Sequence, residues 1–94
     1  MTDDRKVVDN EAQSRFELDL GQAVAVANYR RDGDVVMLLH TEVPQELSGQ
    51  GIGSRLAGGV FEALRARGLR VDARCPFMAS YAARHPELAG MLVR

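Results

Sequence analysis

Glycine stands at every second position of the segment 49–53, and this segment restricts the fold of the chain more than any other. It follows the apolar run 35–39, which is typical of a strand covered on both faces, and Pro44 ends that strand. It precedes the stretch 52–64, in which large apolar side chains recur every four residues, close to the period of a helix. The segment is therefore expected to be a tight turn between a buried strand and an amphipathic helix.

The remaining segments predict a small α/β (α+β) domain. Period-two alternation indicates strands, and an Asp-Gly pair at 32–33 predicts a hairpin. Gly58 and Gly59, in the middle of the helix, indicate that it packs closely on the sheet. The expected elements are three antiparallel strands over 15–20, 23–30 and 35–43, a helix over 52–67, a parallel strand over 69–75, and C-terminal helices over 77–85 and 86–92.

The length and charge of the chain limit the classes of function. Its 94 residues suit one domain, expected over 15–94, after a polar segment over 1–14 that shows no periodicity and is expected to be flexible. A net charge of −1 gives no electrostatic signal for nucleic acid or an anionic membrane, and no apolar run has the roughly 18 residues of a membrane span. One cysteine and two histidines without ligand spacing predict no metal site. The single cysteine and the polar start predict a cytoplasmic protein.

The glycine loop has the features of a phosphate-binding turn. A helix N-terminus exposes unpaired N–H groups with a partial positive charge, and glycines let phosphate oxygens approach the backbone. The Walker loop is excluded because the segment has no lysine, and the dinucleotide fingerprint is excluded because a serine replaces its last glycine. A tight turn without a ligand is the alternative. The expected pyrophosphate cradle consists of Ser48, Gly49, Gln50, Gly51, Ile52, Gly53 and Ser54, with an added contact from Arg55.

Three short motifs carry a resemblance to a known family. Gly51-Ile52-Gly53 fits the second half of the signature Gln/Arg-x-x-Gly-x-Gly/Ala, with Ser48 in the place of Gln or Arg. The runs His40-Thr41-Glu42-Val43-Pro44 and Cys75-Pro76-Phe77 lie on either side of that signature. From residue 15 to the C-terminus, the chain resembles the small stand-alone, YjdJ-type N-acetyltransferase domain proteins of the general N-acetyltransferase (GNAT) superfamily.

The resemblance implies a truncated GNAT-like mixed sheet, acetyl-CoA as cosubstrate, and acetyl transfer to an unidentified amine or thiol acceptor. It also implies that the strand backbone at Thr41 and Val43 binds the pantetheine arm and that Cys75 lies near the acetyl group. The chain has fewer elements before its glycine loop than full members of the superfamily. A non-catalytic acyl-CoA-binding module or interaction subunit is therefore the alternative. An exposed edge of so small a sheet would also favour pairing with a second copy.

Four side chains are candidates for the chemistry of transfer. The resemblance implies that Tyr81 protonates the departing CoA thiolate; the alternative is a core residue with its hydroxyl at the surface. Cys75 either takes the acetyl group before passing it on or is a small buried apolar residue. His40 and Glu42 share one face of their strand by period two. Either can act as a general base, or the two bond each other or nearby backbone.

Overall fold

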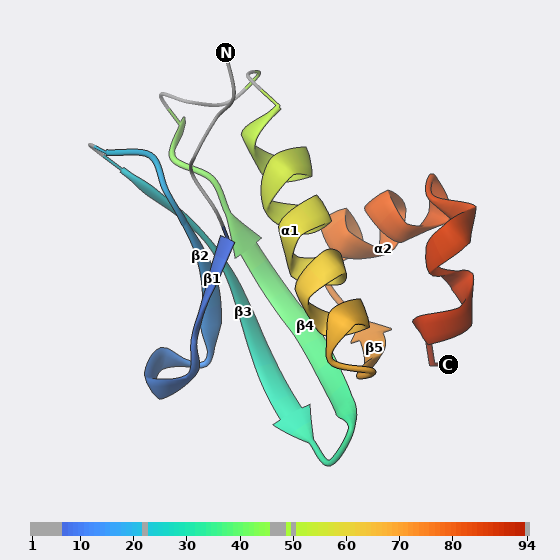
Figure 1. Ribbon diagram of the computed structural model, residues 1–94. Helices are drawn as coiled ribbons and strands as arrows, with labels where there is room; N and C mark the ends of the chain where they lie inside the picture. Colours follow the sequence, from blue (N-terminus) through green and yellow to red (C-terminus); the bar gives the residue numbers. More distant parts are fainter. Residues whose placement is uncertain (1–6, 22, 46–48, 50, 94) are drawn as a thin grey trace.

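The computed structural model describes residues 7–21, 23–45, 49 and 51–93, and Figure 1 shows how their helices and strands are arranged. In chain order the elements are β1 (Val7–Asn10), the 3-10 helix η1 (Glu11–Gln13), β2 (Arg15–Asp19), β3 (Val24–Asp32), β4 (Val35–Glu42), α1 (Ile52–Ala66), β5 (Arg70–Ala73), α2 (Pro76–Ala83) and the 3-10 helix η3 (Pro86–Met91).

The five strands form one sheet in the order β1-β2-β3-β4-β5. Neighbours from β1 to β4 run antiparallel, and β5 pairs in parallel with β4. A parallel neighbour needs a crossover connection, and α1 supplies it. The prediction of a mixed α/β fold, with a helix after the glycine loop and then a parallel strand, is confirmed. The two helical pieces at the C-terminus are confirmed as α2 and η3.

The expectation of a flexible segment over residues 1–14 was wrong for residues 7–13. They form β1 and η1, so the sheet has four antiparallel strands instead of three. Val7 packs against Gly59 of α1, where an added Cβ atom would lie only 2.3 Å from Val7 Cγ2. This contact joins residues far apart in the sequence, so no local pattern in the polar segment indicates the strand.

Hydrogen bonds of the Asp9 carboxylate also hold β1 against the rest of the domain. The Asp9 side chain is 7 % exposed and accepts hydrogen bonds from Tyr29 Oη at 2.6 Å and from Arg67 Nη1 at 2.7 Å. Burial, followed by the hydrogen bond to Asp9 and its negative charge, raises the pKa of Tyr29 to about 12. The phenol therefore remains a donor to Asp9 at neutral pH. Sequence reasoning did not identify this network.

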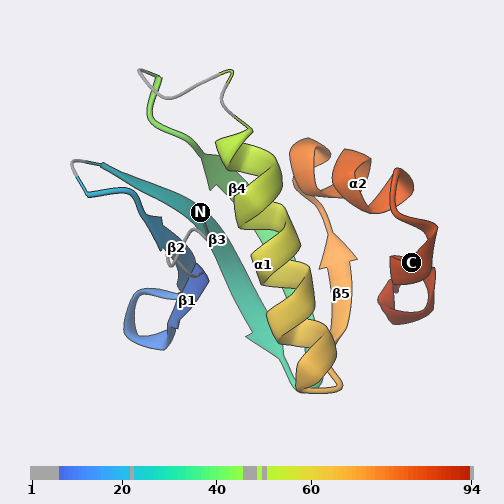
Figure 2. The same cartoon turned by 45° about the horizontal axis from the view of Figure 1, so that its top comes forward.

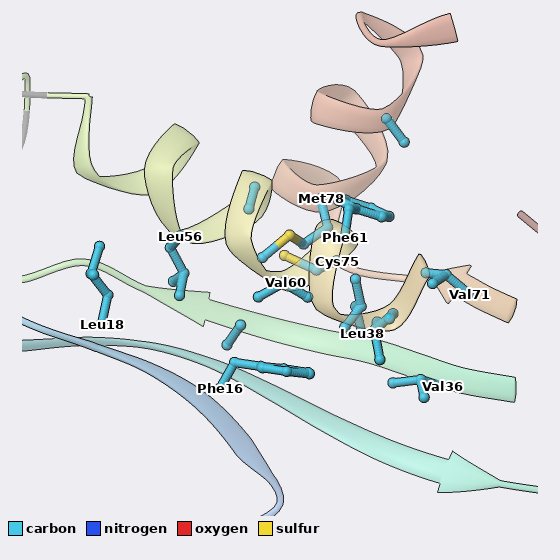
Figure 3. Close-up of a cluster of buried hydrophobic side chains, with 14 of the residues drawn as sticks. Phe16, Leu18, Val36, Leu38, Leu56, Val60, Phe61, Val71, Cys75 and Met78 are labelled. Carbon is cyan, nitrogen blue, oxygen red and sulfur yellow. The ribbon is translucent and has the colours of Figure 1, made fainter. Parts of the chain in front are cut away.

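Both long helices lie on one face of the sheet (Figure 2). Their apolar side chains meet those of the strands in one core, part of which Figure 3 shows. The other face carries no helix from the described part of the chain, so the expectation that the strand 35–39 is covered on both faces was wrong. Leu39, for example, is 43 % exposed. The largest fully buried side chains are Phe16, Leu18, Val36, Leu38, Leu56, Val60, Phe61, Leu64, Val71 and Met78.

An extra residue in β4 changes which side chains face the helices. The pairing with β3 passes from Leu38 directly to His40, so Leu39 forms a β-bulge. Side chains alternate along a strand, and one inserted residue reverses that alternation beyond the insertion. Thr41 therefore faces the helices, as Leu38 does before the bulge. His40 points to the opposite, uncovered face.

The glycines in the middle of α1 make room for two different elements. Gly59 approaches the sheet at β1, which confirms the predicted close packing. Gly58 approaches α2 instead, since an added Cβ atom would lie 3.0 Å from the Tyr81 hydroxyl.

Candidate functional site

The site lies where β4 and β5 stop pairing. The last pair is Leu38 with Ala73, and the Leu38 carbonyl accepts hydrogen bonds from the N–H groups of Arg74 and Cys75 at 3.0 and 2.8 Å. β4 continues to Glu42, whereas the chain after Cys75 turns into α2. The edge of β4 beyond Leu38 is therefore not covered by β5, and Cys75, at the start of α2, contacts Thr41 of β4 there.

Cys75 is the N-cap of α2 and is 5 % exposed, next to Met78 in the core (Figure 3). Its Sγ lies 3.4 Å from Thr41 Oγ1. Burial is the largest influence on the pKa of this thiol and raises it. Hydrogen bonds from the Thr41 hydroxyl and from the backbone N–H groups of Met78, Phe77 and Thr41 together outweigh burial, so the pKa of Cys75 is lowered. A lowered pKa is what a nucleophilic cysteine requires.

The glycine loop gives α1 an open N-terminus. Gly49 and Gly51 have left-handed backbone with φ of 83° and 74°, a conformation that glycine adopts without strain. Gly51 is the N-cap of α1 and has no side chain to satisfy the amides of the first turn. An added Cβ atom at either glycine would meet nothing within 4 Å, so glycine is needed here for its backbone and not for packing. A cavity of about 260 Å³ lies at this end, lined by Val43, Gly49, Gly51, Ile52, Gly53, Ser54 and Phe77.

Other members of the predicted cradle are placed differently. Gly53 lines the cavity, and it also lies under the ring of Phe77, whose Cζ would be 2.7 Å from an added Cβ atom. Arg55 lines a separate cavity on the β1 side of α1. Ser48 and Gln50 lie outside the described residues. The amides and small side chains present fit a phosphate group at the α1 N-terminus.

Tyr81 lies in a different environment from Cys75. Its ring stacks with Phe61, at 5.8 Å between centroids, and with His85, at 4.0 Å. The cavity that Tyr81 lines is bounded by α1 and η3 and includes neither Cys75 nor Thr41. The role of proton donor stays a prediction, and the arrangement gives it no added support.

The two candidate bases bond each other. His40 Nε2 lies 3.1 Å from Glu42 Oε2, and both side chains are on the uncovered face of the sheet, 61 % and 67 % exposed. The expectation that they share a face is confirmed. The bulge directs that face away from Cys75, so the pair and the thiol are on opposite sides of β4. A general-base role for either residue stays a prediction.

Two contributions to the site escaped sequence reasoning. Thr41 was expected to contact the cofactor through its backbone. No role was expected for its side chain, because a period-two pattern does not reveal a bulge. Sequence reasoning gave Phe77 no contact with the glycine loop, whereas its ring covers Gly53. The only sequence signal for the second contact is a glycine and an aromatic residue at the starts of consecutive helices.

Comparison with known proteins agrees with this geometry. Residues 15–91 match the family model of the GCN5-related N-acetyl-transferases. The match covers most of the chain, so the protein belongs to this family, whose members use acetyl-CoA to transfer an acetyl group. A solution structure of a GCN5-like protein from Staphylococcus aureus is similar, with a TM-score of 0.71 and 25 % sequence identity, over 98 % of this chain and 91 % of that one.

Two further findings bear on the class of site. Among the described residues, no cluster of three or more His, Cys, Asp or Glu side chains is arranged to hold a metal ion. In the same part of the chain, none of the helices has the length and apolar character needed to span a membrane.

Proposed function

We propose that this protein binds acetyl-CoA along β4 and transfers its acetyl group through Cys75 to an amine or thiol acceptor. The observation that carries the proposal is the arrangement of two groups at the ends of one uncovered strand edge. The open N-terminus of α1 shares a cavity with Val43, the residue after the end of β4, and the Cys75 thiol lies beside β4 at Thr41.

In this proposal the glycine loop binds the pyrophosphate of acetyl-CoA. The amides of the first turn of α1 would hold pyrophosphate oxygens, since Gly51 has no side chain to satisfy them. The uncovered edge of β4 offers backbone groups to the amides of the pantetheine arm. The Thr41 N–H points at the Cys75 sulfur. The backbone near Val43, just beyond the end of β4, is therefore the main candidate for contacts with the pantetheine arm.

In this proposal the nucleophile is the Cys75 thiolate. Its sulfur attacks the acetyl carbonyl carbon, a new C–S bond forms, and the bond from that carbon to the CoA sulfur breaks, so CoA leaves as a thiolate and takes a proton. The acceptor then attacks the acetylated Cys75, takes the acetyl group, releases its proton to solvent and regenerates the thiolate. Hydrogen bonds from the start of α2 and from Thr41 favour the thiolate at both ends of this cycle.

A thermal melt tests binding at the glycine loop. Acetyl-CoA at a hundredfold excess over its Kd should stabilise the fold by about 2.7 kcal/mol, and ATP should not. Gly51→Ala should remove this shift, because an alanine in left-handed backbone costs about 1–2 kcal/mol and distorts the cap. Gly33→Ala is the matched control, since Gly33 also has positive φ, 63°, but lies in the β3–β4 hairpin. Loss of the shift in both variants, or in neither, would argue against the loop as the binding site.

Intact-mass spectrometry tests the acetylation of Cys75. Incubation with acetyl-CoA should add one acetyl group to the wild-type chain and none to Cys75→Ala. Binding of acetyl-CoA without any acetylation, together with no transfer to amine or thiol acceptors, would favour the non-catalytic acyl-CoA-binding module.

A further inference from the structure

The position of Thr41 depends on the bulge at Leu39. If β4 alternated regularly through Leu39, with no bulge, the side chain facing the helices at this level would be His40, by continuation of the alternation through Val36 and Leu38. With it, the Thr41 hydroxyl lies 3.4 Å from Cys75 Sγ, while His40 is on the opposite face. A backbone irregularity thus places a short hydroxyl, and not an imidazole, against the sulfur.

We propose that Thr41 is a positioning residue for the Cys75 thiol: its hydroxyl donates a hydrogen bond to the sulfur, holds it beside β4 and favours its thiolate form. The transfer step served by this contact rests on the function proposed above. The contact itself does not, because it joins two side chains of the free protein.

Among the largest influences on the pKa of the Cys75 thiol, the Thr41 hydroxyl is the one that comes from another side chain. Of the four hydrogen bonds that act on Cys75 from the described residues, three come from backbone N–H groups, which no ordinary substitution removes. The largest influences on the pKa of Cys75 are burial and these hydrogen bonds. Arg74, its neighbour, is paired with Asp72 at 2.9 Å. A Thr-to-Val change at 41 keeps the shape of the side chain and removes only the hydroxyl.

The experiment measures the rate of Cys75 alkylation by iodoacetamide as a function of pH, in the full-length chain without acetyl-CoA. In Thr41→Val the midpoint of the profile should move to higher pH, and the rate near neutral pH should fall about tenfold, the value of one hydrogen bond to a charged group. Thr41→Ser should restore the wild-type profile. Ser80→Ala, which removes an exposed hydroxyl from α2, is the matched control and should leave the profile unchanged.

A Thr41→Val profile that coincides with the wild-type profile, in a variant that melts within a few degrees of the wild type, would overturn the proposal. So would a profile that Thr41→Ser shifts as far as Thr41→Val does. Acetylation by acetyl-CoA is then followed in the same variants. If the wild type is not acetylated, the proposed transfer fails while the alkylation profiles still decide the role of Thr41.

Discussion

Replacing Gly59 by alanine tests how closely β1 packs on α1. The added methyl group would lie 2.3 Å from Val7 Cγ2 and 2.7 Å from Val7 Cβ, far inside the contact distance of about 3.5–4.0 Å between carbon atoms. Alanine has about 1 kcal/mol more helix propensity than glycine, but overpacking costs about 1–3 kcal/mol. Valine is branched at Cβ and cannot swing away, so β1 itself must move. We expect a net loss of up to about 2 kcal/mol in the free energy of unfolding.

The variant Val7→Gly provides the background in which the sign reverses. It removes both the Cβ atom and the methyl groups that clash, so Gly59→Ala should there raise the free energy of unfolding by up to about 1 kcal/mol through helix propensity. Urea unfolding of the wild type, both single variants and the double variant closes the cycle, and we expect a coupling of about 2 kcal/mol. Additive effects in this cycle would show that Val7 does not rest on Gly59 and would refute the packing of β1 described here.

Three further predictions follow from contacts elsewhere in the fold. The pKa of Tyr29 is raised to about 12 from an ordinary value of 10.0, so the fold favours the protonated phenol. The contribution of this phenol to stability should be complete below pH 10 and lost as the pH rises to about 12. In urea titrations across this range, Tyr29→Phe should flatten that loss. The lowered pKa of Cys75 predicts that its alkylation reaches half its maximal rate at a lower pH in the native chain than in urea, and equal midpoints would contradict the hydrogen bonds assigned to it. In Gly53→Ala the new methyl must displace the Phe77 ring, which is 37 % exposed and free to rotate outward, so the melting temperature should fall only slightly; a loss as large as that of Gly59→Ala would show that the ring is fixed.

Comparison of two glycines shows how far sequence reasoning reached into the site. Gly51 was expected in a loop that caps a helix, and it is there, because positive φ and a helix start are properties of a few consecutive residues. Gly53 was assigned to the same cradle on spacing alone. Its second role under Phe77 depends on where α2 crosses α1, which no spacing within either helix contains.

The order of the elements around the loop follows from the sequence alone, since helical and strand periods and turn residues are local and predict the elements over most of residues 15–92. The sequence also shows which residue types stand at the strand ends. Which of these residues come into contact depends on the packing of the whole domain. A one-residue bulge at Leu39 directs Thr41 to Cys75 and turns His40 and Glu42 to the other face, because one inserted residue reverses every side chain beyond it. The segment Val7–Asn10 has the polar composition of a flexible terminus, yet it forms a strand because Val7 packs on Gly59. Burial between residues far apart in the sequence supplies free energy that local propensity does not.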